Sequence, residues 1–483
     1  MELHDYQCEG VEWMDGRERG VSNPNLPWDA AHARGGILAD EVGLGKTLMT
    51  IALIVRRPVC NTLILAPKSL LLQWKSEFAK FAPCVSVEVS TNGDYTQNHD
   101  PSVCHVVLAS HSRLNSRGVA HPLLLRLCRD VWNRIVIDES HVIKNKKSKL
   151  HIAACHLRSE VRWALTATPV MNKMTDFVNI LKWIGISQET CQNHCDEVSE
   201  LFVKRRTKED ICVDVPSLKL PPCTVNIRRL PFKYSKEREL YCQVHTCMLD
   251  RIQAMATMGN RNAIEALELL LRVRQVCCHP QTYFDGIARQ QKLKPLKWEH
   301  GCTKLDAVLE SVQLQPRGDK TLIFCNFIRE IDAYCEAFSK AGYGVLRLDG
   351  RMSLEERAQV VHTFNCNPAY TVFVMQLHAG GVGYNLQCAN WVHVTSPTWN
   401  PAMQHQIVGR AHRSGQSKEV NVAVYAISEE DTCFVEDYLL NLQDRKKVLM
   451  ADVLKDPRIS DSVTCDTTCI CFGDVLNALR SFK

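Results

Sequence analysis

The sequence predicts an α/β protein built from two parallel-sheet lobes with a helical insert between them. Short apolar runs at residues 62–66 and 134–137 alternate with amphipathic helical stretches, and the same alternation returns at 321–324 and 371–374. Continuous apolar strands separated by helices indicate a parallel sheet covered on both faces. Residues 233–279 contain few β-branched side chains and space their apolar positions as a helix does. This stretch predicts the helical insert.

These patterns divide the chain of 483 residues into three structured parts. A chain of this length is too long for one core, since a domain averages roughly 150 residues. We expect a first lobe at 1–215, a helical insert and linker at 216–300, and a second lobe at 301–455. Residues 456–483 form a short tail to which the sequence assigns no function.

Composition places the chain among globular proteins and limits the classes of partner that it is expected to have. Hydrophobic residues make up 45% and charged residues 23% of the chain, which are ordinary globular values. The net charge of +5 permits a polyanionic partner without requiring one, because affinity for phosphates depends on where the cations lie. The 23 cysteines are an odd number scattered through a long chain, and no apolar run is long enough to span a bilayer. We therefore expect a reduced, soluble, intracellular protein with no membrane partner.

A phosphate-binding loop is predicted at residues 43–47, Gly-Leu-Gly-Lys-Thr, between a predicted strand and a predicted helix. Glycines let backbone N–H groups surround phosphate, the helix N-terminus adds a favourable dipole, and Lys46 supplies positive charge to the β- and γ-phosphates. The Thr47 hydroxyl is the expected Mg²⁺ ligand. The generic loop pattern has a glycine where Asp40 stands, so the match to that pattern is incomplete.

Two carboxylates follow the predicted strand at 135–137. Asp138 and Glu139 then lie at the carboxyl edge of the sheet, where α/β folds bind their ligands. Phosphoryl transfer needs one carboxylate to hold Mg²⁺ and another group to orient the attacking water. We assign Asp138 to the metal and Glu139 to the water. An Asp-Glu pair can also simply begin a helix, but that alternative does not explain its occurrence together with Lys46.

With these two motifs the chain resembles the Swi/Snf family of DNA-dependent ATPases, in the second helicase superfamily. Asp40 is the residue that this family carries before its phosphate loop, so the departure from the generic pattern supports the resemblance. The match extends from about residue 3 to residue 426, and its motifs follow in the order of the family. The first, at residues 3–7, looks like the adenine-recognising Q motif. The others lie at residues 40–47, 65–74, 138–141, 165–169, 204–208, 274–280, 346–350, 379–386 and 406–416. The blocks at 204–208 and 274–280 resemble the family's helical insert and linker.

The resemblance implies two RecA-like lobes, with ATP and Mg²⁺ as cofactors. The residues expected to carry catalysis are Lys46, Asp138, Glu139, Gln406, Arg410 and Arg413. The residues expected to bind the nucleotide are Gln7, Asp40, Glu41, Gly43, Gly45, Lys46, Thr47 and Gly383. The residues expected to contact DNA are Pro67, Lys68, Ser69, Trp74, Ser110, Gly350, Gly381 and Asn385. The expected metal ligands are Thr47 and Asp138.

A pair of arginines near the end of the match is predicted to complete the catalytic site. Arg410 and Arg413 are three residues apart on a predicted helix, so both can point from one face. An isolated Arg-x-x-Arg is usually a solvated basic helix. Here Gln406 lies one helical turn earlier and Gln416 completes the motif, so the resemblance implies arginine fingers that act on the nucleotide held by the other lobe.

The function that the resemblance implies is ATP-driven translocation along double-stranded DNA, in chromatin remodelling, DNA repair or transcription. The expected partner is double-stranded DNA, with chromatin or a DNA-bound protein as a further class. One alternative is a strand-separating helicase on DNA or RNA. Another is a catalytically silent, ATP-gated DNA-binding module, against which the intact Lys46, Asp138 and Glu139 argue.

Localisation in the nucleus is expected by analogy with the family, and a viral or cytoplasmic replication site is the alternative. A run of lysines at 144–149 is also typical of a nuclear import signal. The run directly follows the motif at 138–141 and resembles the family's own continuation there. We therefore favour the interpretation as part of the family motif over that as an import signal.

Overall fold

The computed structural model of the protein describes residues 2–20, 27–90, 95, 100, 103–115, 122–169, 174–214, 220–257, 263–380, 384–413, 415–429 and 435–454. The chain divides into two compact units, with the division between residues 219 and 220. The C-terminal helix α19 (Val435–Leu454) begins in the second unit.

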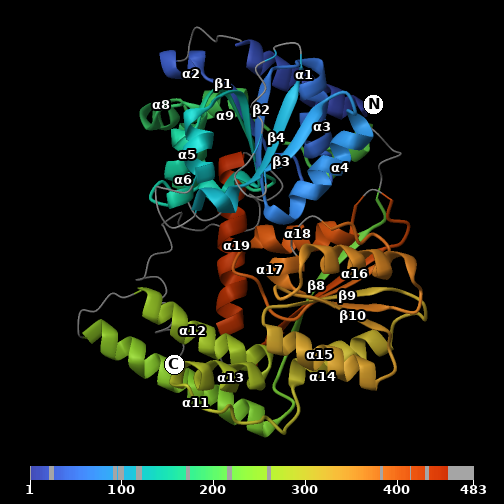
Figure 1. The fold of residues 1–483 in the computed structure, drawn as a ribbon. Coiled ribbons are helices and arrows are strands. Elements are labelled where there is room, and N and C mark those ends of the chain that lie inside the picture. The colour runs from blue at the N-terminus through green and yellow to red at the C-terminus, as the bar shows by residue number, and fades with distance from the viewer. Residues whose placement is uncertain are drawn as a thin grey trace. The chain divides into compact units, whose positions relative to one another are not determined.

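The first unit is organised around a parallel sheet, which has seven strands in the described residues (Figure 1). The strand order is β3-β4-β2-β5-β6-β1-β7, and every neighbouring pair is parallel. The strands are β1 (Arg34–Leu38), β2 (Asn61–Ala66), β3 (Ser86–Ser90), β4 (His105–Ser110), β5 (Val131–Asp138), β6 (Arg158–Leu165) and β7 (Val203–Lys204).

Helices cover both faces of this sheet. Its central strands are therefore apolar at successive positions, because neighbouring side chains point to opposite faces and both faces are buried. In β2, Leu63 and Leu65 belong to one buried cluster, whereas Ile64 belongs to the cluster on the opposite face. The helices α1 (Asp5–Arg19), α3 (Lys46–Arg56) and α4 (Leu71–Phe81) contribute to the cluster of Ile64. The other face is covered by α2 (Trp28–His32), α5 (Pro122–Arg129), α6 (Lys149–His156), α7 (Met174–Ile184), α8 (Gln188–Asn193) and α9 (Cys195–Phe202). The short helix α10 (Lys208–Asp214) follows β7.

A buried ion pair fixes α1 against the sheet. The Nε atom of Arg134, in β5, lies 2.6 Å from Oε1 of Glu18, in α1, and both side chains are 1% exposed. The indole N–H of Trp163 donates to the same carboxylate at 2.9 Å. Buried charges are tolerated when they are paired and hydrogen-bonded, so these contacts hold the helix that carries the expected adenine-recognition segment.

The second unit holds another parallel sheet, with six strands in the part of the chain that the structure describes. Its strand order is β10-β11-β9-β12-β13-β8, again with parallel neighbours. The strands are β8 (Cys223–Leu230), β9 (Thr321–Cys325), β10 (Val345–Leu348), β11 (Val372–Gln376), β12 (Trp391–Val394) and β13 (Val420–Ile427). The predicted α/β class with two RecA-like parallel-sheet lobes is therefore confirmed.

This second sheet is also covered on both faces. The helices α14 (Thr303–Gln313) and α15 (Ile328–Lys340) pack on one face, where Ile331 and Phe338 join the buried cluster of Ile323. The other face packs against α16 (Leu354–Cys366), α17 (Leu377–Gly380) and α18 (Pro401–Ala411), which add Phe364 and Ile407 to the cluster of Leu322.

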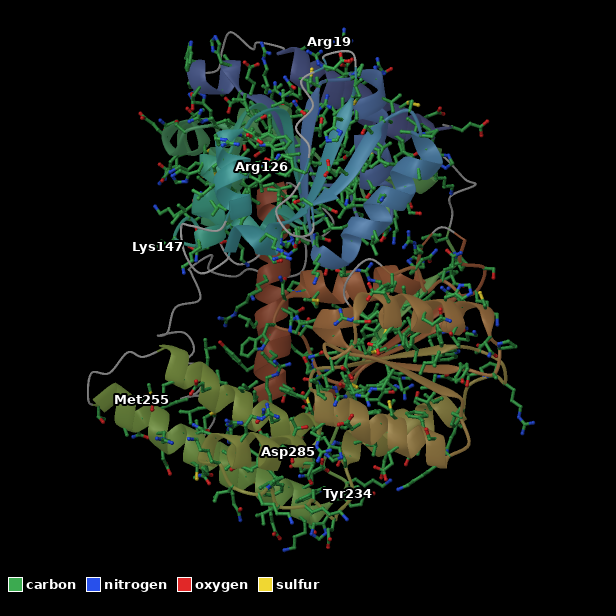
Figure 2. The ribbon with its side chains drawn as sticks, viewed as in Figure 1. Arg19, Arg126, Lys147, Tyr234, Met255 and Asp285 are labelled. Atoms are coloured by element: carbon green, nitrogen blue, oxygen red, sulfur yellow. The ribbon has the colours of Figure 1, made fainter. Side chains whose placement is uncertain are left out.

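The helical insert consists of α11 (Ser235–Thr257), α12 (Ala263–Cys278) and α13 (Pro280–Gln291). The first two cover the helical stretch predicted at 233–279. Asp285 of α13 forms an ion pair with Arg329 of α15, which ties the insert to the helices of the second sheet (Asp285 is labelled in Figure 2). Among the described helices of both units, none is long and apolar enough to cross a membrane.

One strand was not expected within the predicted insert and linker. Strand β8 pairs with β13 over eight register positions, from Cys223↔Val420 to Leu230↔Ile427, and so extends the second sheet. Most of its side chains are exposed, and a polar edge strand lacks the apolar run by which the other strands were recognised. The boundaries of the predicted parts otherwise stay a prediction.

Candidate nucleotide and DNA site

The phosphate loop lies between β1 and α3 and is contacted by the N-terminal motif. The Tyr6 hydroxyl donates to the carbonyl of Leu44 at 3.2 Å, and Nε2 of Gln7 donates to the same carbonyl at 3.5 Å. Gly45 has a φ of +82°, and a Cβ there would lie 2.5 Å from Nε2 of Gln7. A side chain at this position would therefore be strained and would collide with the Q-motif glutamine.

Lys46, the first residue of α3, is turned back onto the loop that precedes it. Its Nζ donates to the carbonyl of Asp40 at 2.7 Å and to that of Glu41 at 3.2 Å. Burial lowers the pKa of Lys46, while the charge of Glu139, followed by those of three other carboxylates, acts in the opposite direction. The structure thus brings Lys46 close to Glu139. A phosphate entering the loop would replace carbonyl oxygens as the acceptor for the ammonium group.

Asp138 and Glu139 stand at the carboxyl edge of β5, as the sequence predicted. Each oxygen of Asp138 accepts one hydrogen bond: Oδ2 from Nε1 of Trp74 at 2.9 Å and Oδ1 from the backbone N–H of Glu139 at 2.9 Å. Burial, together with the neighbouring charge of Glu139, raises the pKa of Asp138 to about 6. A cation beside this carboxylate would favour its ionised form.

Glu139 adopts a backbone conformation that is unusual for a residue with a side chain. Its φ is 50° and its ψ 49°, in the left-handed region. Such conformations cost of order 1–3 kcal/mol and cluster at functional sites. The Glu139 carboxylate lies 3.3 Å from Nδ1 of His141, which places a third polar group of the same motif beside the predicted water-orienting residue.

The oxygen ligands predicted at this edge of the sheet suit Mg²⁺ better than a transition metal. The predicted ligands Thr47 and Asp138 supply a hydroxyl and a carboxylate oxygen, which are hard ligands. Within the described residues no group of three or more His, Cys, Asp or Glu side chains is arranged to hold a metal. Mg²⁺ usually takes only one or two protein oxygens and completes its shell with phosphate and water, so this sparse set is adequate.

In the second unit, the predicted arginines lie at the end of α18. Arg410 is only 6% exposed, and its carbonyl accepts a hydrogen bond from the N–H of Leu386 at 3.1 Å. The helix ends at Ala411, so Arg413 lies two residues beyond it. The expectation that both arginines project from one helix is therefore wrong, because the helix stops between them. Gln406 lies on α18 and is half-buried.

Both units of the chain are similar to known protein families. Residues 6–193 match the SNF2-related domain, and residues 303–415 match the helicase conserved C-terminal domain. A probable global transactivator of Orgyia pseudotsugata multicapsid polyhedrosis virus is 30% identical over 466 residues, which cover 92% of this chain and 90% of the viral protein. The chain belongs to the Swi/Snf family.

Further relatives of this Swi/Snf protein are longer than it is. The human SWI/SNF-related matrix-associated actin-dependent regulator of chromatin subfamily A member 1 is 28% identical over 495 residues, covering 95% of this chain but 44% of the human protein. The DNA repair protein RAD5B of Arabidopsis thaliana is 26% identical over 606 residues, covering 91% of this chain and 47% of its own length. The chain thus spans less than half of these two relatives. A solved Sulfolobus solfataricus SWI2/SNF2 ATPase core in complex with double-stranded DNA is 24% identical, with 95% of this chain and 94% of that chain covered and a TM-score of 0.40.

Asp40, the residue that departs from the generic phosphate loop, has a structural partner in this Swi/Snf chain. Its side chain is fully buried and receives two hydrogen bonds from Arg206, one from Nη2 at 2.5 Å and one from Nε at 3.2 Å. Arg206 also donates to the carbonyl of Tyr6. The Asp40 carboxylate is therefore engaged with Arg206, and this pair links three predicted motifs.

Sequence reasoning did not include Arg206 in the site. The resemblance likened the block at 204–208 to the helical insert and linker, although the predicted bounds put it in the first lobe. The structure puts this block in the first unit, beginning at the last residue of β7, Lys204, which pairs with Leu38 of β1. Glu41, predicted to bind the nucleotide, accepts a hydrogen bond from the backbone N–H of Lys208 at 2.9 Å. The clustered positive charge of 204–208 was the available signal, but nothing in the sequence pairs it with acidic residues more than 160 positions earlier.

The predicted DNA contacts fall into different environments. Lys68 is exposed, and Ser69 and Pro67 are half-buried at the turn before α4. Trp74 departs from the prediction, because its side chain is 1% exposed and its N–H is directed at Asp138 rather than at the surface. Ser110 is buried at the carboxyl end of β4.

Two of the DNA contacts predicted in the second unit, Gly350 and Asn385, lie outside its strands. The N–H of Gly350, after β10, donates to Oε1 of Gln376 at 2.9 Å. The side-chain oxygen of Asn385 accepts a hydrogen bond from its neighbour two residues on. Gly381 and the nucleotide-binding candidate Gly383 lie outside the described residues.

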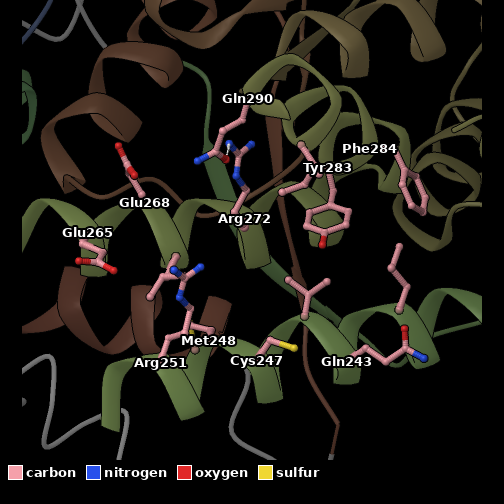
Figure 3. Close-up of a pocket in the computed structure, with 14 residues that line it drawn as sticks. Gln243, Cys247, Met248, Arg251, Glu265, Glu268, Arg272, Tyr283, Phe284 and Gln290 are labelled. Carbon is pink, nitrogen blue, oxygen red and sulfur yellow. Dashed lines mark hydrogen bonds between the residues drawn. The ribbon is translucent and has the colours of Figure 1, made fainter. Parts of the chain in front are cut away.

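A cavity of about 750 Å³ is lined by α11, α12 and α13 in the helical insert (Figure 3). Its lining mixes apolar side chains such as Met248 and Phe284 with the charged groups Arg251 and Glu268. None of the residues predicted to bind ATP or DNA contributes to this lining, so the cavity is separate from the predicted site.

Proposed function

We propose that this chain is a Mg²⁺-dependent ATPase that moves along double-stranded DNA without separating its strands. The observation that carries the proposal is the convergence of Lys46, Asp138 and Glu139 at one edge of the first sheet, in a chain of the Swi/Snf family. In this scheme Lys46 binds the transferring phosphates and Glu139 orients the attacking water. Mg²⁺ held by Thr47 and Asp138 would neutralise developing charge on the phosphates.

The second lobe supplies the remaining catalytic groups in this proposal. Arg410 and Arg413, with Gln406, stabilise charge on the phosphoryl group bound to the first lobe, as arginine fingers do in other NTPases. DNA bound by both lobes favours the arrangement in which these residues reach the nucleotide. Hydrolysis is then faster on DNA than without it.

Double-stranded DNA, alone or in chromatin, is the proposed partner. Relatives named as a chromatin regulator and as a DNA repair protein support this assignment. Contacts to the phosphate backbone carry affinity and no sequence information, so binding should be sensitive to salt and tolerant of sequence. By the same analogy we place the protein in the nucleus, and the viral relative makes a viral replication site the alternative. A fluorescent fusion excluded from nuclei and replication sites would contradict this placement.

The test of activity compares nucleic acids in one preparation. ATP turnover should rise with duplex DNA more than with single-stranded DNA or RNA. The protein should displace a triplex-forming third strand in the presence of ATP while leaving a forked duplex paired. Stronger stimulation by single-stranded RNA, or efficient unwinding of the fork, would favour the strand-separating alternative. Absence of turnover under all conditions would favour the ATP-gated binding module.

A further inference from the structure

Trp74 combines deep burial with a polar contact to the predicted metal site. It lies on the first turn of α4, is 1% exposed, and packs its ring 6.2 Å from that of Phe78. Its Nε1–H donates to Oδ2 of Asp138 at 2.9 Å, across 64 positions of sequence. Asp138 is also largely buried. The contact therefore forms inside the core of the first lobe, shielded from water.

The indole N–H had other ways to be satisfied. Buried tryptophan N–H groups need an acceptor, and a backbone carbonyl is sufficient. Trp132 donates to the carbonyl of Leu127 at 3.1 Å, and Trp183 to that of Ala154 at 3.1 Å. Trp74, like Trp163, donates instead to a carboxylate, and the one that it contacts ends β5 at the edge where the predicted nucleotide site lies.

The two donors fix the orientation of this carboxylate. Oδ1 is held by the Glu139 N–H and Oδ2 by Trp74, so rotation about the Cβ–Cγ bond would break both hydrogen bonds. A carboxylate oxygen can accept at two lone-pair positions, and each donor uses only one of them. Each oxygen therefore keeps a lone pair for a cation, and the two donors hold the carboxylate plane in place.

We propose that Trp74 is a positioning residue that orients Asp138 for Mg²⁺, an inference that rests on the proposed function. Groups that hydrogen-bond to a ligating carboxylate fix its orientation, and removing them typically lowers metal affinity or activity by about 10–100-fold. Trp74 touches neither nucleotide nor metal in this scheme and acts through Asp138 alone.

The experiment replaces the hydrogen bond and retains an aromatic ring. Trp74→Phe removes the donor, and Trp132→Phe is the matched control, because it removes a buried indole N–H of the same lobe that donates to a backbone carbonyl. Binding of Mn²⁺ in the presence of ADP is measured by the electron paramagnetic resonance signal of free Mn²⁺. ADP affinity is measured separately in EDTA, and all work is done well below the thermal midpoints of the variants.

We expect Trp74→Phe to weaken Mn²⁺ binding at least about tenfold, with ADP affinity in EDTA unchanged within a few-fold. Raising the Mg²⁺ concentration should restore much of its ATP turnover, which a merely destabilising change would not allow. Trp132→Phe should match the wild type in all three measurements. Equal Mn²⁺ affinity in Trp74→Phe and wild type would overturn the inference alone. A wild type that binds no Mn²⁺ with nucleotide would overturn the proposed function and the inference with it.

Discussion

Arg206 and Asp40 form a two-point ion pair inside the first lobe, with Nη2 of Arg206 2.5 Å from Oδ2 of Asp40. The Asp40 side chain is fully buried and that of Arg206 is 10% exposed. Arg206 also lies 5.3 Å from the centre of the Tyr6 ring. The pair therefore joins the phosphate loop to two segments that are distant in sequence, and it accounts for an aspartate where a generic phosphate loop has glycine.

Breaking this pair should strongly destabilise the first lobe. Arg206→Met leaves a buried carboxylate without its partner, at a cost of about 3–5 kcal/mol. The control is Arg56→Met, since the Arg56 side chain is 45% exposed and its ion pair with Asp15 should contribute no more than about 1 kcal/mol. Denaturant unfolding followed by tryptophan fluorescence measures both. Equal losses in the two variants would show that the buried pair has no special role.

Most of the fold was accessible from the sequence, because apolar strands and helical spacing are local signals. The run at 134–137 became the centre of β5, and residues 138 and 139 follow at its carboxyl edge. Strand β8 was missed, since its mostly exposed side chains carry no apolar run and its partner β13 lies about 190 residues later.

The site was accessible in part, for a related reason. The phosphate loop and the acidic pair have their own local patterns, which a sequence displays. The partners of Asp40 and Asp138 do not, because Arg206 and Trp74 meet them only through tertiary packing. The end of α18 was also beyond reach, since helix boundaries are uncertain by one or two residues.

Lys46→Ala should weaken ATP binding only through the lost contact to the phosphates of ATP. Charge-assisted hydrogen bonds of this kind contribute about 1.5–3 kcal/mol, which corresponds to a loss of affinity of roughly 10–100-fold. Affinity for adenosine, which has no phosphate, should stay near that of the wild type. Lys75→Ala removes an exposed lysine from α4 in the same lobe and serves as control. Titration with fluorescent analogues gives both affinities, and an ATP affinity unchanged by Lys46→Ala would exclude the predicted phosphate contact.

His393 should make the second lobe less stable in mild acid. The amide of Gln315 lies with its nitrogen 2.9 Å from Nε2 of His393 and its oxygen bonded to the Thr321 hydroxyl. Because that nitrogen can only donate, Nε2 accepts, and Nδ1 carries the proton toward the Tyr425 hydroxyl at 2.9 Å. Burial, with a smaller effect of Arg228, lowers the pKa of His393 to about 3.

The direction of the pH effect follows from these pKa values. The unfolded chain takes up a proton on this histidine near pH 6.5, and the folded chain does so only near pH 3. Stability contributed by the neutral ring is therefore present above pH 6.5 and is lost as the pH falls below it, by up to about 1.4 kcal/mol per pH unit. The thermal midpoint of His393→Gln should fall less than that of the wild type between pH 7.5 and 5.5. His300→Gln, at an exposed histidine, is the control and should respond to pH as the wild type does. A wild-type pH response in His393→Gln would contradict the role of His393 in acid sensitivity.

Arg410 and Arg413 provide the sharpest test of the two-lobe catalytic scheme. Either Arg410→Ala or Arg413→Ala should abolish DNA-stimulated ATP turnover, because arginine fingers contribute about 10³–10⁵ in rate in other NTPases. Nucleotide affinity should remain within a few-fold of the wild type, since the phosphate loop belongs to the first lobe. Arg413→Ala is the cleaner variant, because Arg413 lies beyond α18 whereas Arg410 is largely buried.

Two further variants test whether stimulated turnover depends on the guanidinium group itself and whether the effect is specific to this site. Arg413→Lys keeps the positive charge but loses the planar, five-donor guanidinium, so it should recover little of the stimulated turnover. Arg317→Ala removes an exposed arginine of the second lobe and should leave turnover unchanged. Phosphate release and fluorescent-analogue titration are measured in the same preparations. If Arg410→Ala and Arg413→Ala both keep near-normal stimulation while Lys46→Ala loses it, hydrolysis depends on the first lobe alone and the second lobe must serve DNA binding instead.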